Sequence, residues 1–350
     1  MSRRIVKIVV DAGGHLVPRE SEMPALKDGQ VLVKVAVSLV SPGTEMNFIK
    51  TRRTKPDTDA KDRPFGYANA GEVVETKGDC GALKPGMRVA CMGGGYALHS
   101  NYANVPVNMI VPIPDSVSFE QASYACLGAT AMQSVRRADP RLGENGIVLG
   151  LGIIGNVASQ LCMLSGARVA GWETNSFRID VARRCGIKNT VNSKEVDPVE
   201  TTKALFAPYA SEFAIFAFGG SATKTYESVS KCMVVSGDGH MMGRAVLVGG
   251  CEVIIFGGAS NGNIDIRVSS RTGPGYHDPV YEHGRSYPAV FVQFDTQRNL
   301  KEIIRLIDEH RLLVDPMTSH RIPMSSPDEA ANLLLDHPDK ALGVIFKMEH

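Results

Sequence analysis

The spacing of hydrophobic residues changes about 120 residues into the chain. Before that point the apolar positions form short, Val-rich runs separated by Gly, Pro and Asp, a pattern typical of β-strands. These runs are 5–10, 30–40, 71–76 and 88–91. They predict a compact barrel-like or sandwich domain that carries its chemistry on loops.

From residue 118 onward the spacing becomes helical, and from 146 to about 290 short apolar runs alternate with helices. The strands expected here are 147–149, 168–172, 212–217, 245–248 and 252–256. This alternation implies right-handed β-α-β crossovers and a parallel sheet covered on both faces. An amphipathic helix is expected at 298–310, and the tail predicts a strand, a helix and a strand over 319–323, 327–336 and 342–347.

A glycine motif follows the strand expected at 147–149. Gly150, Gly152 and Gly155 give G-x-G-x-x-G at the start of a helix, and Glu173 ends the next strand, eighteen residues after Gly155. A strand, three glycines, a helix and an acid in this order form the dinucleotide-binding fingerprint. The cofactor-binding residues expected from it are Gly150, Gly152, Ile153, Ile154, Gly155, Glu173, Arg178 and Gly219.

Glu173 also bears on the choice between NAD and NADP. A carboxylate at this position accepts hydrogen bonds from the ribose hydroxyls and repels a 2′-phosphate, so NAD is favoured. Arg178 would soften that repulsion, which leaves NADP possible; its alternative role is a solvated charge on a helix.

Composition narrows the class of protein. A chain of 350 residues with 43% hydrophobic and 21% charged residues suits two globular domains. The formal net charge of +1 does not favour binding to nucleic acid or to an anionic membrane. No apolar stretch of the sequence reaches membrane-spanning length. The seven cysteines are dispersed and never spaced C-x-x-C, which predicts a reducing compartment and a cytoplasmic protein.

Several further stretches resemble the medium-chain dehydrogenase/reductase family. They are Pro-Gly-Thr-Glu at 42–45, Gly-Tyr-Ala-Asn-Ala-Gly-Glu-Val-Val at 66–74, Lys-Pro-Gly-Met-Arg-Val-Ala at 84–90 and Asp-Pro-Met-Thr-Ser-His-Arg at 315–321. More narrowly, 41–45, 93–99 and 269–276 look like a zinc-free branch that is often fused to a second oxidoreductase domain in sugar-modifying gene sets.

The resemblance implies an α/β protein with two domains. A β-rich, GroES-like catalytic domain would comprise 1–126 and 295–350, and a Rossmann domain with a doubly wound parallel sheet would comprise 127–294. It also implies a homodimer or homotetramer.

Zinc-dependent relatives hold their catalytic metal with a Cys, a His in a G-H-E motif and a later Cys. In this chain the first position is Pro42, the G-H-E motif has become Gly-Tyr-Ala at 66–68, and only Cys126 matches a ligand. A catalytic zinc needs three protein ligands, so we expect no metal.

Hydride transfer without a metal still needs a group that handles the hydroxyl proton. Tyr67 replaces the family histidine, Thr44 matches the hydroxyl that relays the proton in zinc-dependent relatives, and His99 is a third candidate acid or base. Each has a structural alternative: Tyr67 as a packing residue, Thr44 as the cap of a helix over 45–50, and His99 as a structural or surface residue.

A polar loop at 269–287, rich in Gly and Pro, predicts a lid or binding loop, with a structural loop at a dimer edge as the alternative. The expected substrate-binding residues are Glu45, Tyr96, Cys126, Arg271 and Tyr276.

The sequence therefore favours a metal-independent oxidoreductase that transfers hydride between NAD(H) and a hydroxyl or carbonyl of a sugar, sugar derivative or polyol. Two alternatives stay open. One is a reductase of enones or quinones, and the other is a protein that binds a nicotinamide cofactor without turnover.

Overall fold

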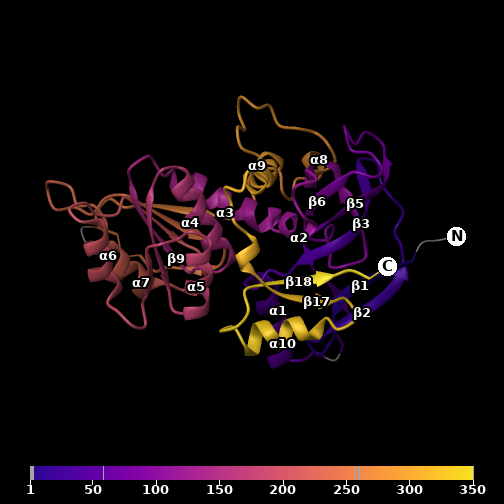
Figure 1. Cartoon of the computed structure of the whole chain (residues 1–350), viewed down its shortest axis with the longest axis horizontal. Helices are drawn as coiled ribbons and strands as arrows, with labels where there is room; N and C mark the ends of the chain where they lie inside the picture. The colour runs from indigo at the N-terminus through magenta and orange to yellow at the C-terminus, as the bar shows by residue number, and fades with distance from the viewer. Residues whose placement is uncertain (1–3, 58, 256, 259–260, 350) are drawn as a thin grey trace. The chain divides into compact units, whose positions relative to one another are not determined.

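The computed structural model describes residues 4–57, 59–255, 257–258 and 261–349. The chain forms two compact units, and Figure 1 shows their elements. The first unit comprises Met1–Ala129 and Thr272–His350, and the second comprises Thr130–Arg271. Across the described part of the chain, no helix is both long enough and apolar enough to cross a membrane.

The first unit is built on a seven-stranded sheet of order β17-β18-β3-β5-β6-β8, with β7 paired to β3. Its strands are β3 (Gln30–Leu39), β5 (Ala68–Lys77), β6 (Arg88–Met92), β7 (Tyr102–Pro106), β8 (Ile110–Pro112), β17 (Thr318–Pro323) and β18 (Gly343–Lys347). A smaller sheet of order β2-β1-β4 is formed by β1 (Arg4–Val10), β2 (Leu16–Glu22) and β4 (Arg63–Pro64).

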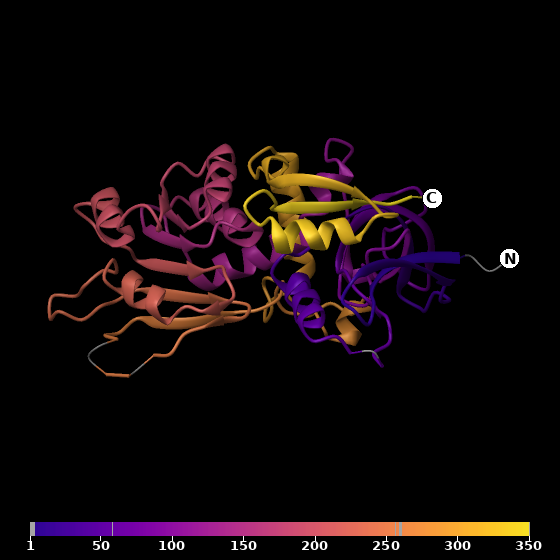
Figure 2. The same ribbon diagram turned by 90° about the horizontal axis from the view of Figure 1, so that it is seen from below.

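The end of the chain completes this unit. Strand β18 pairs antiparallel with β3, so that Ile345 lies opposite Leu39. Ile8, Ile49 and Phe346, which come from both ends of the chain, share one buried core. Figure 2 shows the last strands and α10 (Asp328–Asp336) in yellow, and α10 packs against α1 (Thr44–Thr54).

The first unit has three further helices and two single 3-10 turns in its described residues. They are α2 (Phe119–Ala122), α8 (Pro279–Glu282), α9 (Thr296–Asp308) and the single turns η1 (Val107–Met109) and η2 (Asp315–Met317). Helix α3 (Ala125–Ala138) carries the chain from the first unit into the second.

The second unit contains a six-stranded parallel sheet of order β11-β10-β9-β12-β14-β16. Numbered along the chain this is 3-2-1-4-5-6, the order of the doubly wound dinucleotide-binding fold. The strands are β9 (Asn145–Leu149), β10 (Arg168–Glu173), β11 (Thr190–Asn192), β12 (Phe213–Phe216), β14 (Arg244–Val248) and β16 (Asp265–Ser269). The predicted α/β class, with a Rossmann sheet and a separate β-rich sheet, is confirmed.

Four helices accompany this sheet: α4 (Ile153–Leu164), α5 (Ser176–Arg184), α6 (Pro198–Phe206) and α7 (Thr223–Ser230). Alternate strand residues such as Ile147 and Trp172 pack with Phe206 of α6 and Val229 of α7. Helices α4 and α5 contact β10, and α4 also contacts β9. The short, continuous apolar runs of the sequence are explained by strands buried on both faces.

Two expectations need correction. The run 252–256 is not a strand of the main sheet: β15 (Cys251–Glu252) pairs only with β13 (Gly220–Ser221), and Phe256 lies outside the described residues. The sixth strand is instead β16, an edge strand whose alternating apolar and polar residues lack a continuous apolar run. Residues 272–294, expected in the nucleotide-binding domain, group with the first unit, because Tyr276 and Tyr281 bond to its loops.

Candidate active site

The glycine motif forms the turn that its spacing predicts, between β9 and α4. Gly150 has a φ of +82°, which disfavours a side chain, and its N–H donates to the carbonyl of Trp172 over 2.8 Å. A Cβ on Gly155 would lie 1.7 Å from the carbonyl oxygen of Gly150, so the helix approaches the turn as closely as backbone allows. Gly152 caps α4 without a side chain and has no atom near its Cβ position, which leaves the helix N-terminus open to an anion.

The acid at the end of β10 is tied to this turn. Glu173 is buried; its Oε2 accepts from the N–H of Leu151 at 2.8 Å and its Oε1 from the N–H of Thr174 at 2.7 Å. Arg178, in the first turn of α5, brings a guanidinium nitrogen to 4.0 Å from that carboxylate. The Nε of Arg178 is buried with no hydrogen-bond partner among the described residues.

Other groups lie at the same edge of the sheet, where the parallel strands end. Gly219 follows the end of β12, the strand next to β9. Ser269 ends β16, and its hydroxyl is buried without a partner in the described part of the chain. Ligands of doubly wound sheets bind at this carboxyl edge. Ile153 is buried and Ile154 half-buried in the first turn of α4.

In the first unit, Tyr67 immediately precedes β5. The preceding residue, Gly66, has to be glycine for two reasons. Its φ is +109°, and a Cβ there would lie 2.4 Å from the backbone nitrogen of His99. Burial raises the pKa of the Tyr67 phenol well above its usual value, and Glu45 and Cys126 raise it further. Hydrogen bonds with the hydroxyls of Ser41 and Thr44 act the other way.

Thr44 is the first residue of α1 and does not cap it. The cap is Gly43, which contributes no side-chain hydrogen bond, so the structural alternative for Thr44, a helix cap, is wrong. Its exposed side chain bonds to Tyr67 instead. Ser41 was not among the expected site residues, although its hydroxyl also lowers the pKa of the Tyr67 phenol. Its position directly before the Pro-Gly-Thr-Glu stretch was the signal that the sequence offered.

Glu45 and His99 lie behind this phenol and are closed to a substrate. The Oε2 of Glu45 accepts from the N–H of Ser41 at 2.6 Å, and its Oε1 lies 3.2 Å from Nε2 of His99. The other ring nitrogen of His99 bonds to the hydroxyl of Ser38 at 2.7 Å. Since the His99 side chain is fully buried and both its nitrogens are engaged, we correct its role from acid or base to positioning residue, and Glu45 from substrate binding to the same role.

The remaining expected substrate residues are dispersed. Cys126 is buried, and its thiol pKa is raised by burial and by Glu45, which places it near the Tyr67 cluster. Tyr276 accepts from the N–H of Gly94 at 2.7 Å, and Tyr96 donates to Glu282 at 3.2 Å, so both hydroxyls hold loops of the first unit. Arg271 is the exposed last residue of the second unit, with a φ of +63°.

The donors around Tyr67 do not suit a zinc ion. Pro42 has no side-chain ligand atom, and both ring nitrogens of His99 are already hydrogen-bonded. Within the described ranges, no three His, Cys, Asp or Glu side chains are grouped so that they could hold a metal.

Comparison with known proteins agrees with the dehydrogenase class. No protein-family model matches the chain. An alcohol dehydrogenase of Moraxella sp. (strain TAE123) is 25% identical over 224 residues, covering 55% of this chain and 64% of the relative. The L-threonine 3-dehydrogenase of Serratia proteamaculans (strain 568) is 28% identical over 200 residues, covering 49% of this chain and 58% of the relative. The chain thus spans less than two thirds of these curated relatives.

Solved structures match over nearly the whole chain. An Escherichia coli oxidoreductase/dehydrogenase of unknown specificity superposes with a TM-score of 0.81 at 17% identity, covering 99% of this chain and 100% of the other. Galactitol-1-phosphate dehydrogenase from Escherichia coli gives 0.76 at 17% identity, covering 98% and 99%. The fold is therefore that of the alcohol dehydrogenases and their structural neighbours, as the resemblance in sequence implied.

Proposed function

We propose that this protein is a nicotinamide-dependent oxidoreductase that interconverts a hydroxyl and a carbonyl group of a small molecule. The observation that carries the proposal is the half-buried phenol of Tyr67, which lies beside the hydroxyls of Ser41 and Thr44. It stands where zinc-dependent relatives have a metal-binding histidine. The names of the sequence relatives, alcohol dehydrogenase and L-threonine 3-dehydrogenase, support the same class of reaction.

The second unit supplies the features that a dinucleotide cofactor needs. The open Cβ position of Gly152 and the free N–H groups at the start of α4 fit a pyrophosphate, and Glu173 fits the ribose hydroxyls. When bound, the nicotinamide accepts or supplies the hydride. NAD is preferred because the carboxylate of Glu173 repels a 2′-phosphate. The guanidinium of Arg178, 4.0 Å from that carboxylate, is the group that would admit NADP.

Tyr67 handles the proton. Its raised pKa keeps the proton on Oη, so the phenol acts as a hydrogen-bond donor and acid toward a substrate oxygen during carbonyl reduction. The hydroxyls of Ser41 and Thr44 would stabilise the phenolate left behind, because their hydrogen bonds favour the ionised form. In the oxidative direction the same phenolate takes the proton back.

We propose that this chemistry runs without zinc, because the donor set around Tyr67 is unsuitable for the ion. The proposed substrate is a sugar, sugar derivative or polyol. Its support is the resemblance to the sugar-associated branch together with structural neighbours named galactitol-1-phosphate dehydrogenase and 2R,3R-butanediol dehydrogenase. The homodimer or homotetramer and the cytoplasmic location expected from the sequence stay predictions.

The test is a turnover screen on chelator-treated protein, with NAD and NADP, against sugars, sugar acids, polyols, enones and quinones. Oxidation of a polyol or sugar that requires Tyr67 supports the proposal and names the substrate. Turnover on enones or quinones alone would overturn it in favour of a C=C or quinone reductase. NADH binding without turnover on any of these classes would overturn it in favour of a cofactor-binding protein.

A further inference from the structure

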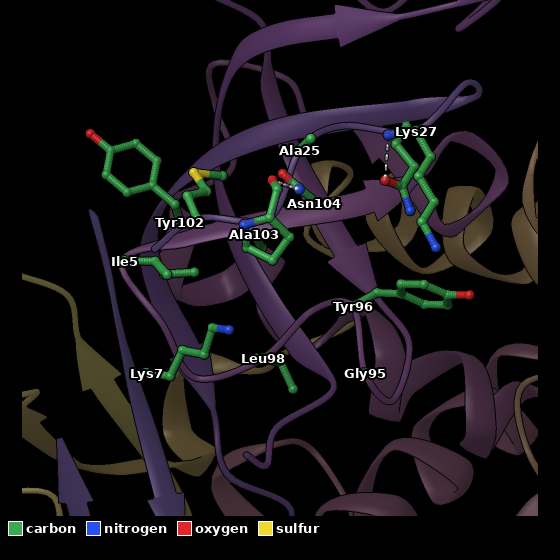
Figure 3. A pocket seen from close by; sticks show the side chains of 13 residues that line it. Ile5, Lys7, Ala25, Lys27, Gly95, Tyr96, Leu98, Tyr102, Ala103 and Asn104 are labelled. Atoms are coloured by element: carbon green, nitrogen blue, oxygen red, sulfur yellow. Dashed lines mark hydrogen bonds between the residues drawn. The ribbon is translucent and has the colours of Figure 1, made fainter. Parts of the chain in front are cut away.

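A separate cavity lies in the first unit, between β1, the connection that follows β2, and the segment 95–104 (Figure 3). Its volume is about 210 Å³. This is smaller than the pockets of about 300–1,000 Å³ that hold drug-sized ligands, so the space suits one small molecule. Neither Tyr67 nor Glu45 lines it.

The cavity wall is positively charged. Lys7 and Lys27 both line it, and the lining contains no Asp or Glu. In Figure 3 the two lysines lie on opposite sides of the space. Neither ammonium group forms an ion pair with any residue in the described ranges. Glu282, which is not part of the lining, accepts a hydrogen bond from the wall residue Tyr96 at 3.2 Å and another from the N–H of His277 at 2.9 Å.

One wall residue carries a polar atom with no partner. The amide nitrogen of Asn104 donates to the carbonyl of Pro24 at 2.8 Å, while its Oδ1 is buried without a hydrogen bond from any described residue. This oxygen is closed to the space, so the polar groups that the wall offers to a charged ligand are the ammonium groups of Lys7 and Lys27.

The rest of the wall is apolar or aromatic. Ile5, Leu98 and the ring of Tyr102 provide surfaces on which the carbon face of a small ring packs. We propose that this cavity is a binding site for a small organic anion of the size of a sugar acid or a sugar phosphate. Lys7 and Lys27, on opposite sides of the space, provide the ammonium groups that bind the anion.

Lysine footprinting on the full chain tests this site directly. The protein is acetylated with and without D-glucuronate, glucose 6-phosphate or D-glucose, and modification of each lysine is measured by mass spectrometry. We expect either anion, or both, to slow acetylation of Lys7 and Lys27, while neutral glucose does not. Lys50, an exposed residue of α1, serves as the internal control. Protection of the lysines by D-glucuronate indicates that the site binds a carboxylate, and protection by glucose 6-phosphate indicates that it binds a phosphate.

Variants then assign the contacts. Lys7→Met and Lys27→Met are each expected to weaken binding of the protecting anion about tenfold, the loss of one charge-assisted contact. Lys50→Met and Tyr67→Phe should leave the affinity unchanged, so the result is independent of the proposed activity. Absence of protection at both lysines, equal protection by glucose, or unchanged affinity in both variants would overturn the site and leave two solvated lysines.

Discussion

Glu45 and His99 form a buried polar pair, with the carboxylate Oε1 3.2 Å from Nε2 of the imidazole. Their side chains are 5% and 0% exposed. Phe65 and Phe346 pack edge-on against the imidazole, with ring centroids 4.7 and 5.0 Å away. The pair thus joins the start of α1 to the loop before β7, and it fixes the position of the Glu45 carboxylate near Tyr67.

Removing the imidazole should cost considerable stability. His99→Ala leaves the Glu45 carboxylate buried without its partner and opens a cavity between two aromatic rings, so we expect the free energy of unfolding to fall by about 3–5 kcal/mol. Denaturant titration measures it. His15→Ala is the matched control, since the 2.9 Å contact of His15 with Asp328 is largely exposed and should be worth less than about 1 kcal/mol. Equal, small losses in both variants would remove His99 from this role.

The pKa of Tyr67 should respond to Glu45. Burial and the Glu45 charge both raise it, so the phenol stays protonated through roughly pH 10, where ordinary tyrosines ionise. The pKa of Tyr67 is higher in the folded protein than in the unfolded chain, so protonation of the phenol stabilises the folded state. This contribution to the free energy of unfolding is fully present below about pH 10 and is lost as the pH rises toward the folded pKa. Glu45→Gln should lower the pKa of Tyr67, which a ¹³C NMR titration of labelled tyrosine would detect, with Tyr67→Phe identifying the signal. An unchanged titration in Glu45→Gln would show that the carboxylate does not act on the phenol.

Two glycines of the motif should separate folding from cofactor binding. Gly155→Ala would place a Cβ 1.7 Å from a backbone oxygen, so we expect a loss of about 3 kcal/mol or more in unfolding free energy. Gly152→Ala meets no atom and should change stability by less than about 0.5 kcal/mol, yet weaken NADH binding about tenfold, because the methyl group fills the space for the pyrophosphate. Thermal unfolding and NADH fluorescence titration measure the two effects. Full NADH affinity in a folded Gly152→Ala protein would contradict this placement of the cofactor.

Cofactor preference should depend on Glu173 and Arg178 in opposite ways. Glu173→Gln removes the charge that repels a 2′-phosphate, so the affinity for NADPH relative to NADH should rise about tenfold. Adding Arg178→Gln should cancel that gain without affecting NADH. Arg183→Gln, an exposed arginine of the same helix, is the control. Binding is read by fluorescence titration, and a ratio that does not move in Glu173→Gln would rule out ribose contact.

The sequence predicted the elements whose signals are local. The turn from Gly150 to Gly155 and the strands on either side of it follow from glycine spacing and apolar runs within 36 residues, 143–178. Helix α9 was likewise expected within two residues at either end. The edge strand β16 was missed because an exposed edge needs no continuous apolar run.

The roles of His99 and Tyr276 were not predictable in the same way. His99 meets a carboxylate 54 residues away, and the phenol of Tyr276 meets a backbone N–H 182 residues away. Neither separation has a periodic pattern, so only the folded chain shows that both side chains are already engaged. For the same reason the role of Ser38, whose hydroxyl bonds to His99 61 residues away, had no signal in the sequence.

The most direct test of the account is the turnover of chelator-treated Tyr67→Phe on the substrate found in the screen. If the phenol handles the proton, kcat should fall by about two to four orders of magnitude while NADH affinity stays unchanged. Tyr209→Phe, an exposed tyrosine of the second unit, should behave like the parent protein. A near-normal kcat in Tyr67→Phe, or a parent activity that chelation abolishes and zinc restores, would contradict the central claim.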